Sequence, residues 1–127
     1  MSGAKFLLDT NIILGILKES EAALKLVEAV PFEACCYSAI TRMELLGFPG
    51  ILEEEVAQIQ GMLSCLTNFP LDRPIEDKVI EIRQQHKFKL PDAIIAATAL
   101  VNGARLITLD QKLDRIYKDL SVAENLN

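Results

Sequence analysis

Short apolar runs alternate along this chain with longer segments of helical spacing. Runs rich in large apolar residues at 5–9, 33–37, 66–71 and 105–108 are typical of short buried strands. Between them, apolar residues recur three and four positions apart, which is the pattern of a helix with one buried face. This alternation predicts an α/β protein in which helices cover both faces of a mainly parallel sheet.

Capping and helix-breaking residues predict where the helices begin and end. Asn11 is expected to cap the first helix, and Ser20 the second, which ends at Pro31. Ser38 is expected to cap a third helix that ends at Gly47. The remaining predicted elements are helices at residues 51–66, from 74, from 91 to 103 and around 113–117, and a last strand near residues 120–122.

The helix that begins at Pro91 is apolar on nearly all sides, which predicts a central position in the fold. Its apolar run at residues 93–101 is much shorter than the about 20 residues that cross a membrane. Near the N-terminus only three large apolar residues precede Asp9, too few for the core of a signal peptide. We therefore expect a cytoplasmic protein without a membrane span.

Length and composition are those of one folded domain, expected over residues 1–127, since 50% of the residues are hydrophobic and 24% are charged. The net charge of −5 weighs against broad, non-specific attraction to nucleic acids, which depends on lysine and arginine. Cys35, Cys36 and Cys65 form no CxxC pair. We interpret them as reduced core residues rather than a disulfide framework or a zinc site.

Four acidic residues lie beside apolar residues, where a charge is costly to bury unless it is paired or holds a metal. Asp9 and Asp110 follow predicted strands, and Asp92 lies in the first turn of the most apolar helix. Glu44 follows Ile40 by four residues, which places it beside the inward face of its helix. Because ligands gather at the carboxyl ends of parallel strands, one crevice is expected to collect all four acids.

Each of these acids also has an ordinary structural explanation, such as a turn, a helix cap or a position at the rim of a helix. Together, however, four carboxylates repel one another unless a cation joins them. Mg²⁺ and Mn²⁺ prefer such oxygen ligands without histidine or cysteine. A metal of this kind lowers the pKa of a bound water and stabilises charge on a phosphodiester, so hydrolysis of phosphodiester bonds is predicted.

Four stretches, in order, resemble the PIN-domain ribonucleases, in particular the VapC-type toxins of toxin–antitoxin pairs. They are LDTN at residues 8–11, the segment 38–45 with its Glu-Leu pair, PDA running into IIAATA at residues 91–99, and LITLD at residues 106–110. The resemblance implies a three-layer α/β/α sandwich and a Mg²⁺ or Mn²⁺ site on Asp9, Glu44, Asp92 and Asp110. It also implies Asn11 and Thr108 as polar supports of that site.

The same resemblance implies hydrolysis of single-stranded RNA that leaves a 5′-phosphate and a 3′-hydroxyl, without a covalent intermediate. It further implies a cognate antitoxin as partner, with antitoxin side chains entering the active site, and a homodimer. One departure concerns the last motif, where many relatives have an acid followed by Phe, whereas this chain reads Asp110-Gln-Lys-Leu-Asp114. Which of Asp110 and Asp114 is the fourth acid is therefore left open.

Other function classes fit the sequence less well. A phosphoryl-receiver domain requires paired acids at its first strand, and a haloacid-dehalogenase-type phosphatase requires Asp-x-Asp where this chain has Asp9-Thr10-Asn11. A ribonuclease that uses two histidines is excluded, because His86 is the only histidine and is expected at the surface. The remaining alternative is a PIN fold that acts as a non-catalytic binding module in a regulatory or RNA-processing complex.

Two further features have both a functional and an ordinary interpretation. Arg83, Lys87 and Lys89 precede Asp92, and Arg42 is close to Glu44, so they are either phosphate contacts or solvated surface charges. The helix at residues 51–66, with Phe48 before it, offers an apolar groove to a partner or a second copy, unless core packing explains it.

Overall fold

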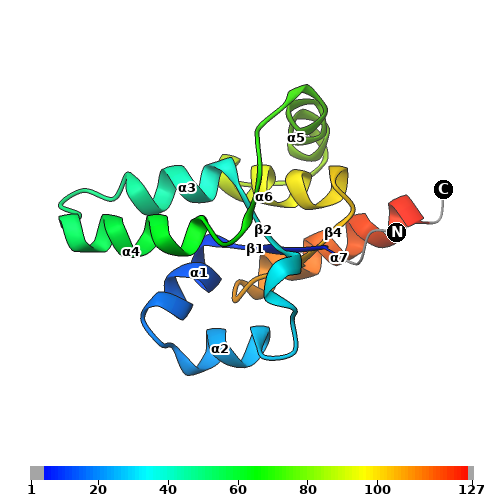
Figure 1. Ribbon diagram of the computed structural model, residues 1–127. Helices are drawn as coiled ribbons and strands as arrows, with labels where there is room; N and C mark the ends of the chain where they lie inside the picture. Colours follow the sequence, from blue (N-terminus) through cyan, green and yellow to red (C-terminus); the bar gives the residue numbers. More distant parts are fainter. Residues whose placement is uncertain (1–4, 126–127) are drawn as a thin grey trace.

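The computed structural model describes residues 5–125, and its centre is a sheet of four parallel strands (Figure 1). The strands lie in the order β3-β2-β1-β4. They are β1 (Lys5–Leu8), β2 (Cys35–Ser38), β3 (Thr67–Phe69) and β4 (Ala104–Ile107). Every neighbouring pair is parallel, with Phe6 opposite Cys35 and Leu8 opposite Ile107. The predicted parallel α/β architecture is therefore confirmed.

Seven helices of the described residues connect and cover the strands. They are α1 (Thr10–Leu17), α2 (Glu21–Val27), α3 (Ala39–Leu46), α4 (Glu53–Leu63), α5 (Arg73–Gln85), α6 (Leu90–Val101) and α7 (Gln111–Asn125), with a short 3₁₀ turn at Phe32–Ala34. Ser38 caps α3 as predicted, because its hydroxyl oxygen accepts the backbone N–H of Ile40 at 3.2 Å.

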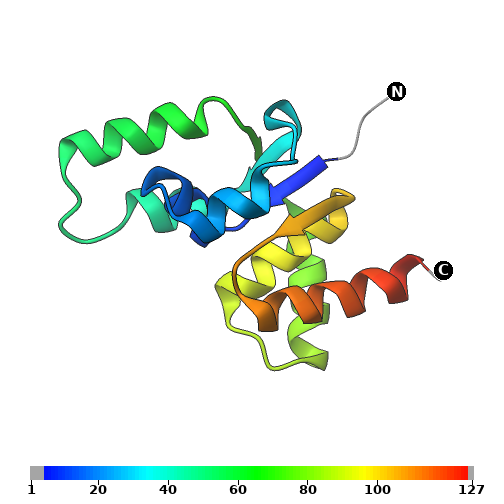
Figure 2. The same cartoon turned by 90° about the horizontal axis from the view of Figure 1, so that it is seen from below.

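The alternation of side chains along the strands divides the core into two apolar clusters, one on each face of the sheet. Leu7 and Leu106 point to the face covered by α5, α6 and α7, whereas Leu8 and Tyr37 point to the face covered by α1, α2, α3 and α4. Figure 2 shows the two groups of helices on opposite sides of the strands. The result is a three-layer α/β/α sandwich.

The helix α6 is buried on nearly all sides, as its composition predicts. Every residue from 93 to 99 is buried, because the sheet lies on one side of α6 and α5 packs on the other. Its 12 residues are far fewer than the about 20 that cross a membrane. Among residues 5–125, no helix is both long and apolar enough to span a bilayer.

The predicted strand near residues 120–122 is wrong, because these residues belong to α7. Leu113, Tyr117 and Leu120 recur at intervals of four and three, so a helix brings all three to the core cluster that contains α6. The hydroxyl of Tyr117 donates to the carbonyl of Ala104 at 2.6 Å, which ties α7 to β4. The short apolar run alone does not distinguish a strand from the end of a longer helix.

Two smaller predictions are also wrong. Asn11 lies inside α1, and the residue that caps this helix is Asp9, whose carboxylate accepts the N–H of Thr10 at 2.7 Å. Cys65 is exposed after the end of α4, whereas Cys35 and Cys36 are buried in the core as expected. A polar residue near a helix start and a cysteine near a helix end do not by themselves reveal their burial.

Gly15 lies where α1 and α2 approach each other, and this contact generates a stability prediction. A Cβ atom at position 15 would lie 2.5 Å from the Cβ of Ala23. Overpacking costs about 1–3 kcal/mol, which exceeds the about 0.5–1 kcal/mol that alanine gains over glycine in a helix. Gly15→Ala is therefore expected to lower the free energy of unfolding by about 1–2 kcal/mol in urea titrations.

Gly61 is the matched control, because it lies in α4 and a Cβ atom at position 61 would meet no heavy atom within 4 Å. Gly61→Ala is expected to raise the free energy of unfolding by about 0.5–1 kcal/mol. If Gly15→Ala is as stabilising as Gly61→Ala, then α1 and α2 are not in close contact.

Candidate active site

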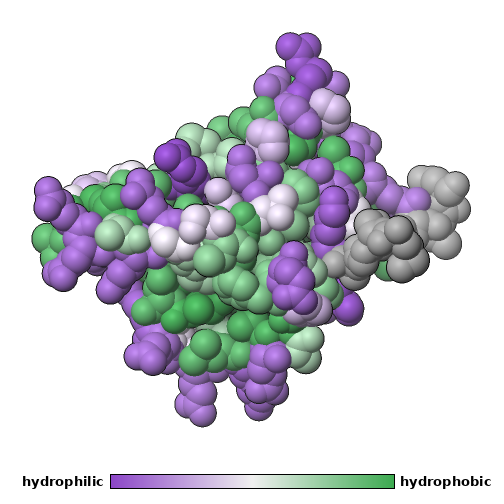
Figure 3. Space-filling view, viewed as in Figure 1, coloured by the Kyte–Doolittle hydropathy of each residue, from purple (hydrophilic) through white to green (hydrophobic). Residues whose placement is uncertain are grey.

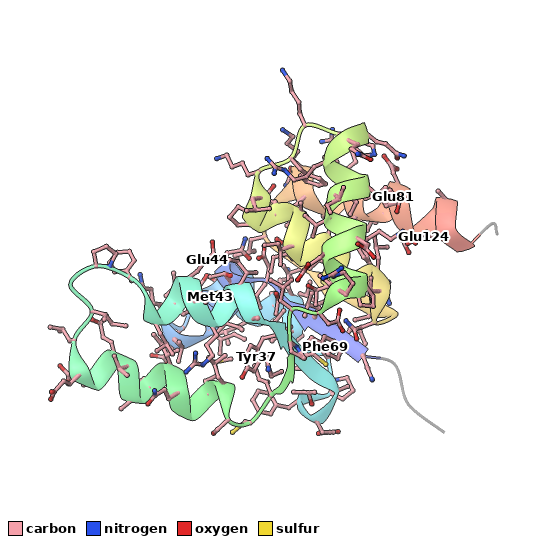
Figure 4. All side chains as sticks on the ribbon, turned by 90° about the horizontal axis from the view of Figure 1, so that it is seen from above. Tyr37, Met43, Glu44, Phe69, Glu81 and Glu124 are labelled. Carbon is pink, nitrogen blue, oxygen red and sulfur yellow. The ribbon has the colours of Figure 1, made fainter. Side chains whose placement is uncertain are left out.

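An open crevice of about 530 Å³ lies at the carboxyl ends of β1 and β4. It is lined by the starts of α1 and α6, the residue before α7, the second half of α3 and the loop that follows α3. Its lining residues are Asp9, Thr10, Asn11, Leu14, Met43, Glu44, Gly47, Phe48, Pro49, Asp92 and Asp110. Four acids separated widely in sequence therefore meet at one place. Figure 4 shows Glu44 on α3 beside Met43, on the side of α3 that is nearer to α6.

Asp9 is the most buried of these acids, with only 7% of its surface exposed. Its carboxylate accepts three hydrogen bonds, from the Thr10 N–H at 2.7 Å, the Thr108 hydroxyl at 2.7 Å and the Asn11 amide at 3.2 Å. Burial raises the pKa of Asp9, and the charges of Glu44 and Asp110 raise it further against the lowering effect of the hydrogen bonds. The surroundings of Asp9 therefore disfavour its ionised form relative to a carboxylate in water.

Asn11 and Thr108 join the start of α1 to the segment after β4. The Asn11 amide donates to Asp9, and its carbonyl oxygen accepts the Leu109 N–H at 3.1 Å. The Thr108 hydroxyl donates to Asp9 and its oxygen accepts the Asp110 N–H at 3.0 Å. These two side chains thus fix the position of Asp9 relative to Asp110, although nearly 100 residues separate Asp9 from Thr108 in the sequence.

Glu44 is held by a chain of two hydroxyl groups that the sequence did not single out. Thr10 Oγ1 donates to Glu44 Oε1 at 2.7 Å and lies 2.9 Å from Thr41 Oγ1. A carboxylate only accepts, so the proton of Thr10 goes to Glu44 and the hydroxyl of Thr41 must donate to Thr10. The positions of these threonines, between Asp9 and Asn11 and three residues before Glu44, were the available signal.

The side chain of Glu44 is more exposed than its sequence position predicted. The inward face of α3 carries Thr41 and Leu45, which are 0% and 5% exposed, whereas Glu44 itself is exposed. Glu44 still lines the crevice, at the rim rather than in the interior. Thr41 and Glu44 lie one turn apart in α3, on neighbouring parts of the helix surface. The buried hydroxyl of Thr41 can therefore bind Thr10, which in turn donates to the exposed carboxylate of Glu44.

Asp92 is half-buried in the first turn of α6. Burial raises the pKa of Asp92, and the charges of Asp110 and Asp9 raise it further, while Lys89 and Lys112 lower it. Three carboxylates of the crevice therefore act on one another electrostatically. The positive end of the α6 macrodipole favours an anion at this position.

The geometry separates Asp110 from Asp114, which the sequence left open. Asp110 Oδ1 accepts the backbone N–H groups of Lys112 at 3.0 Å and Leu113 at 3.1 Å, so one oxygen caps the start of α7. The structure gives Asp110 Oδ2 no partner within residues 5–125. Asp114 instead forms an ion pair with Lys118 at 3.0 Å and lines a different hollow. Only Asp110 lines the crevice with the other acids.

The crevice suits a divalent cation that keeps part of its water shell, rather than one bound by protein ligands alone. Among residues 5–125, no three His, Cys, Asp or Glu side chains are arranged to hold a metal ion by themselves. Mg²⁺, however, commonly binds through one or two carboxylates and keeps several waters. The four carboxylates that line the crevice offer only oxygen donors, which are the ligands that Mg²⁺ prefers. His86, by contrast, is exposed at the end of α5, as expected, and does not line the crevice.

Comparison with known proteins finds one matching family and several similar solved structures. The PIN domain model matches residues 6–119. No curated protein matches the chain. Among solved structures, a toxin–antitoxin complex from Klebsiella pneumoniae contains a chain that is 33% identical, with a TM-score of 0.70 over 87% of this chain and 88% of that one.

Two further structures are similar. FitAcB from Neisseria gonorrhoeae is 26% identical, with a TM-score of 0.74 over 89% of this chain and 93% of that one. VapBC2 from Rickettsia felis, bound to a DNA fragment from its promoter, is 21% identical, with a TM-score of 0.74 over 87% and 92% of the two chains. The last likeness concerns the fold alone.

The hydroxyl of Thr108 generates a prediction about the crevice. Thr108→Val removes the donor to the buried Asp9 carboxylate and the acceptor of the Asp110 N–H. Leaving buried polar groups without partners costs about 1–3 kcal/mol. The free energy of unfolding in urea, measured at neutral pH in EDTA, is expected to fall by this amount.

Thr108→Ser keeps the hydroxyl and loses one methyl group, so it is expected to cost less than about 1 kcal/mol. Equal losses for the valine and serine variants would show that the hydroxyl does not stabilise Asp9.

Proposed function

The chain belongs to the PIN domain family, and we propose that it is a divalent-metal-dependent endoribonuclease, the toxin of a VapBC-type toxin–antitoxin pair. The observation that carries the proposal is the crevice at the carboxyl edge of the sheet, where Asp9, Glu44, Asp92 and Asp110 meet. The 33% identity to a chain of a toxin–antitoxin complex supports the assignment to such a pair.

In this proposal Asp9 and Asp92 are the principal metal ligands, and Glu44 and Asp110 complete the site directly or through water. When bound, Mg²⁺ or Mn²⁺ lowers the pKa of water and neutralises charge that develops on a phosphodiester. The crevice is open, so a single strand of RNA can reach the acids from solvent. Hydrolysis by water then leaves a 5′-phosphate and a 3′-hydroxyl without a covalent intermediate.

The remaining residues of the site orient the acids. Asn11 and Thr108, together with the backbone N–H of Thr10, hold the Asp9 carboxylate in one orientation. Thr10 does the same for Glu44, with Thr41 behind it. The free Oδ2 of Asp110 is available to the site while Oδ1 caps α7. Such supports reduce the reorganisation that binding and catalysis require.

The surface beside the crevice supports an antitoxin partner. A hollow of about 220 Å³ between α1, α3 and α4 is lined by apolar residues that include Leu14, Phe48 and Ile51. Phe48 is 67% exposed and Leu14 is 39% exposed. Thr10 and Glu44 line both this hollow and the crevice, so a partner bound in the hollow reaches the acids. Figure 3 shows hydrophobic residues over the neighbouring α1 and α2.

We also propose that the protein forms a homodimer.

The first experiment tests metal-dependent cleavage. Purified protein is expected to cleave single-stranded RNA with Mg²⁺ or Mn²⁺ and to be inactive in EDTA. Asp9→Asn and Asp92→Asn, which lose a ligand charge, are expected to lower the cleavage rate at least about a hundredfold while circular dichroism shows a folded protein.

Asp114→Asn is the matched control, because Asp114 is an acid near the start of α7 that lines another hollow. It is expected to retain the wild-type rate. Full activity in EDTA would falsify the metal mechanism, and a folded wild-type protein that binds RNA without cutting it would favour the non-catalytic binding module.

The second experiment tests the partner. A short reading frame next to the gene, with a DNA-binding N-terminal part, is expected to encode a protein that co-purifies with this chain and prevents RNA cleavage. Phe48→Ala is expected to weaken the complex at least about tenfold in a binding titration, because a large exposed aromatic side chain leaves the hollow.

Leu71→Ala is the control, because Leu71 is a 41% exposed apolar residue that does not line the hollow. Equal affinity of the wild-type, Phe48→Ala and Leu71→Ala proteins for the partner would place its binding site elsewhere.

A further inference from the structure

A larger hollow lies between the second half of α5 and the start of α6. Its volume is about 860 Å³, and it is lined by the cations Arg83, Lys87 and Lys89 together with Phe88 and Leu90. We refer to this surface as the basic groove. Residues 83–91 contain no acid, although the chain as a whole has a net charge of −5. Three of the 13 Lys and Arg residues of the chain thus lie close together in a segment without an acid.

The cations of the basic groove have no acidic partners within the described part of the chain. The ion pairs among residues 5–125 involve Arg73, Lys78 and Lys118, and none of them involves Arg83, Lys87 or Lys89. Solvated cations usually gain little from isolated surface pairs. Three neighbouring cations that form no ion pair create a local positive potential that attracts a polyanion.

A hydrogen bond holds the connection between α5 and α6 in place. The Nε of Arg83 donates to the backbone carbonyl of Phe88 at 3.4 Å, which folds the connection between α5 and α6 back onto α5. In Figure 4, side chains that end in nitrogen extend from this connection into solvent. Lys87 and Lys89 thus lie on the connection between two packed helices, and Arg83 lies in the last turn of α5.

The basic groove and the acidic crevice both include the first turn of α6, which contributes Leu90 to the groove and Asp92 to the crevice. Lys89 lines the groove and is also the residue before α6, three positions before Asp92. Its charge, together with that of Lys112 at the start of α7, acts on the Asp92 carboxylate. A phosphodiester chain that crosses the acids is therefore met by cations on the α6 side. The opposite side of the crevice offers the apolar hollow of Leu14 and Phe48 instead.

The apolar residues of the basic groove suit nucleobases. Leu90 is 48% exposed and Phe88 is half-buried, so each presents an apolar surface between cationic side chains. Single-stranded nucleic acids bind to surfaces that combine lysine or arginine for the phosphates with aromatic or apolar side chains for the bases. A protein partner would leave three cations unpaired unless it were strongly acidic, so an RNA strand is the better match.

We propose that the basic groove binds the RNA strand adjacent to the cleaved bond, with Arg83, Lys87 and Lys89 on its phosphates and Phe88 and Leu90 against its bases. This inference rests on the proposed ribonuclease function and extends it: the substrate is a strand several nucleotides long, held on the α5–α6 side of the acids. Arg42, by contrast, has no part in it, because it lines neither the crevice nor the groove.

The test compares binding and cleavage in Lys87→Gln/Lys89→Gln. Fluorescence anisotropy with a labelled 12-nucleotide single-stranded RNA in EDTA measures binding without cleavage. The variant is expected to raise Kd about tenfold at low salt and to lower the slope of log Kd against log salt by about 1.4, since each phosphate contact on a single strand contributes about 0.7. Lys87→Arg/Lys89→Arg is expected to restore both values.

The matched control is Lys25→Gln/Arg73→Gln, which removes the same charge at two exposed positions that line neither the crevice nor the groove. It is expected to keep the wild-type Kd and salt slope. Cleavage in Mg²⁺ gives a second measurement: the glutamine variant of the groove is expected to raise KM for the 12-nucleotide RNA about tenfold, whereas the control variant keeps the wild-type KM.

The outcomes separate this inference from the proposed function. If the wild-type protein cleaves RNA and the groove and control variants bind equally well, the groove inference is wrong and the ribonuclease proposal stands. A change of oligomeric state in light scattering with unchanged RNA binding would assign the groove to a contact between copies of the chain, which also overturns it. If the wild-type protein cleaves no RNA, both proposals fail together.

Discussion

The structure depends on the burial of one carboxylate, Asp9, at the junction of β1, α1 and β4. Its backbone N–H donates to the carbonyl of Ile107 at 3.0 Å, its side chain caps α1, and Thr108 and Asn11 bind its oxygens. A buried charge is costly unless it is paired, and here the compensation comes from hydrogen bonds rather than from a cation of the protein. Burial raises the pKa of Asp9, and the nearby charges of Glu44 and Asp110 raise it further.

The two-sided core explains why the other acids reach the same place. In a parallel sheet, each strand returns through a helix, so the helices that follow β1 and β4 begin at one edge. The helix α6 is buried between the sheet and α5, which brings its first turn, with Asp92, to that edge as well. On either side of the acids the surface differs in character: apolar between α1, α3 and α4, and cationic between α5 and α6. The net charge alone therefore does not describe this surface, because three cations share one hollow of an acidic protein.

The sequence predicted the strands, most helices and the central position of α6, because these depend on local periodicity and on capping residues. It failed where local patterns are ambiguous. Residues 120–122 contain too short an apolar run to separate strand from helix, and α7 prevailed because it buries Leu113 and Tyr117. Asn11 resembled a cap, but its amide is used by Asp9 and its carbonyl by Leu109. Cys65 has no local signal of its exposure.

For the candidate site, the sequence by itself determined which acids lie at the ends of apolar elements. An acid next to an apolar run can be recognised from the order of the residues alone. Tertiary structure alone decided that Asp110 rather than Asp114 lines the crevice, that Thr10 and Thr41 support Glu44, and that the cations before Asp92 form a groove. Each of these depends on contacts or charges between side chains of different elements, up to 99 residues apart. Such relations arise only when the chain is packed, because local spacing encodes which face a residue occupies and not what it meets there.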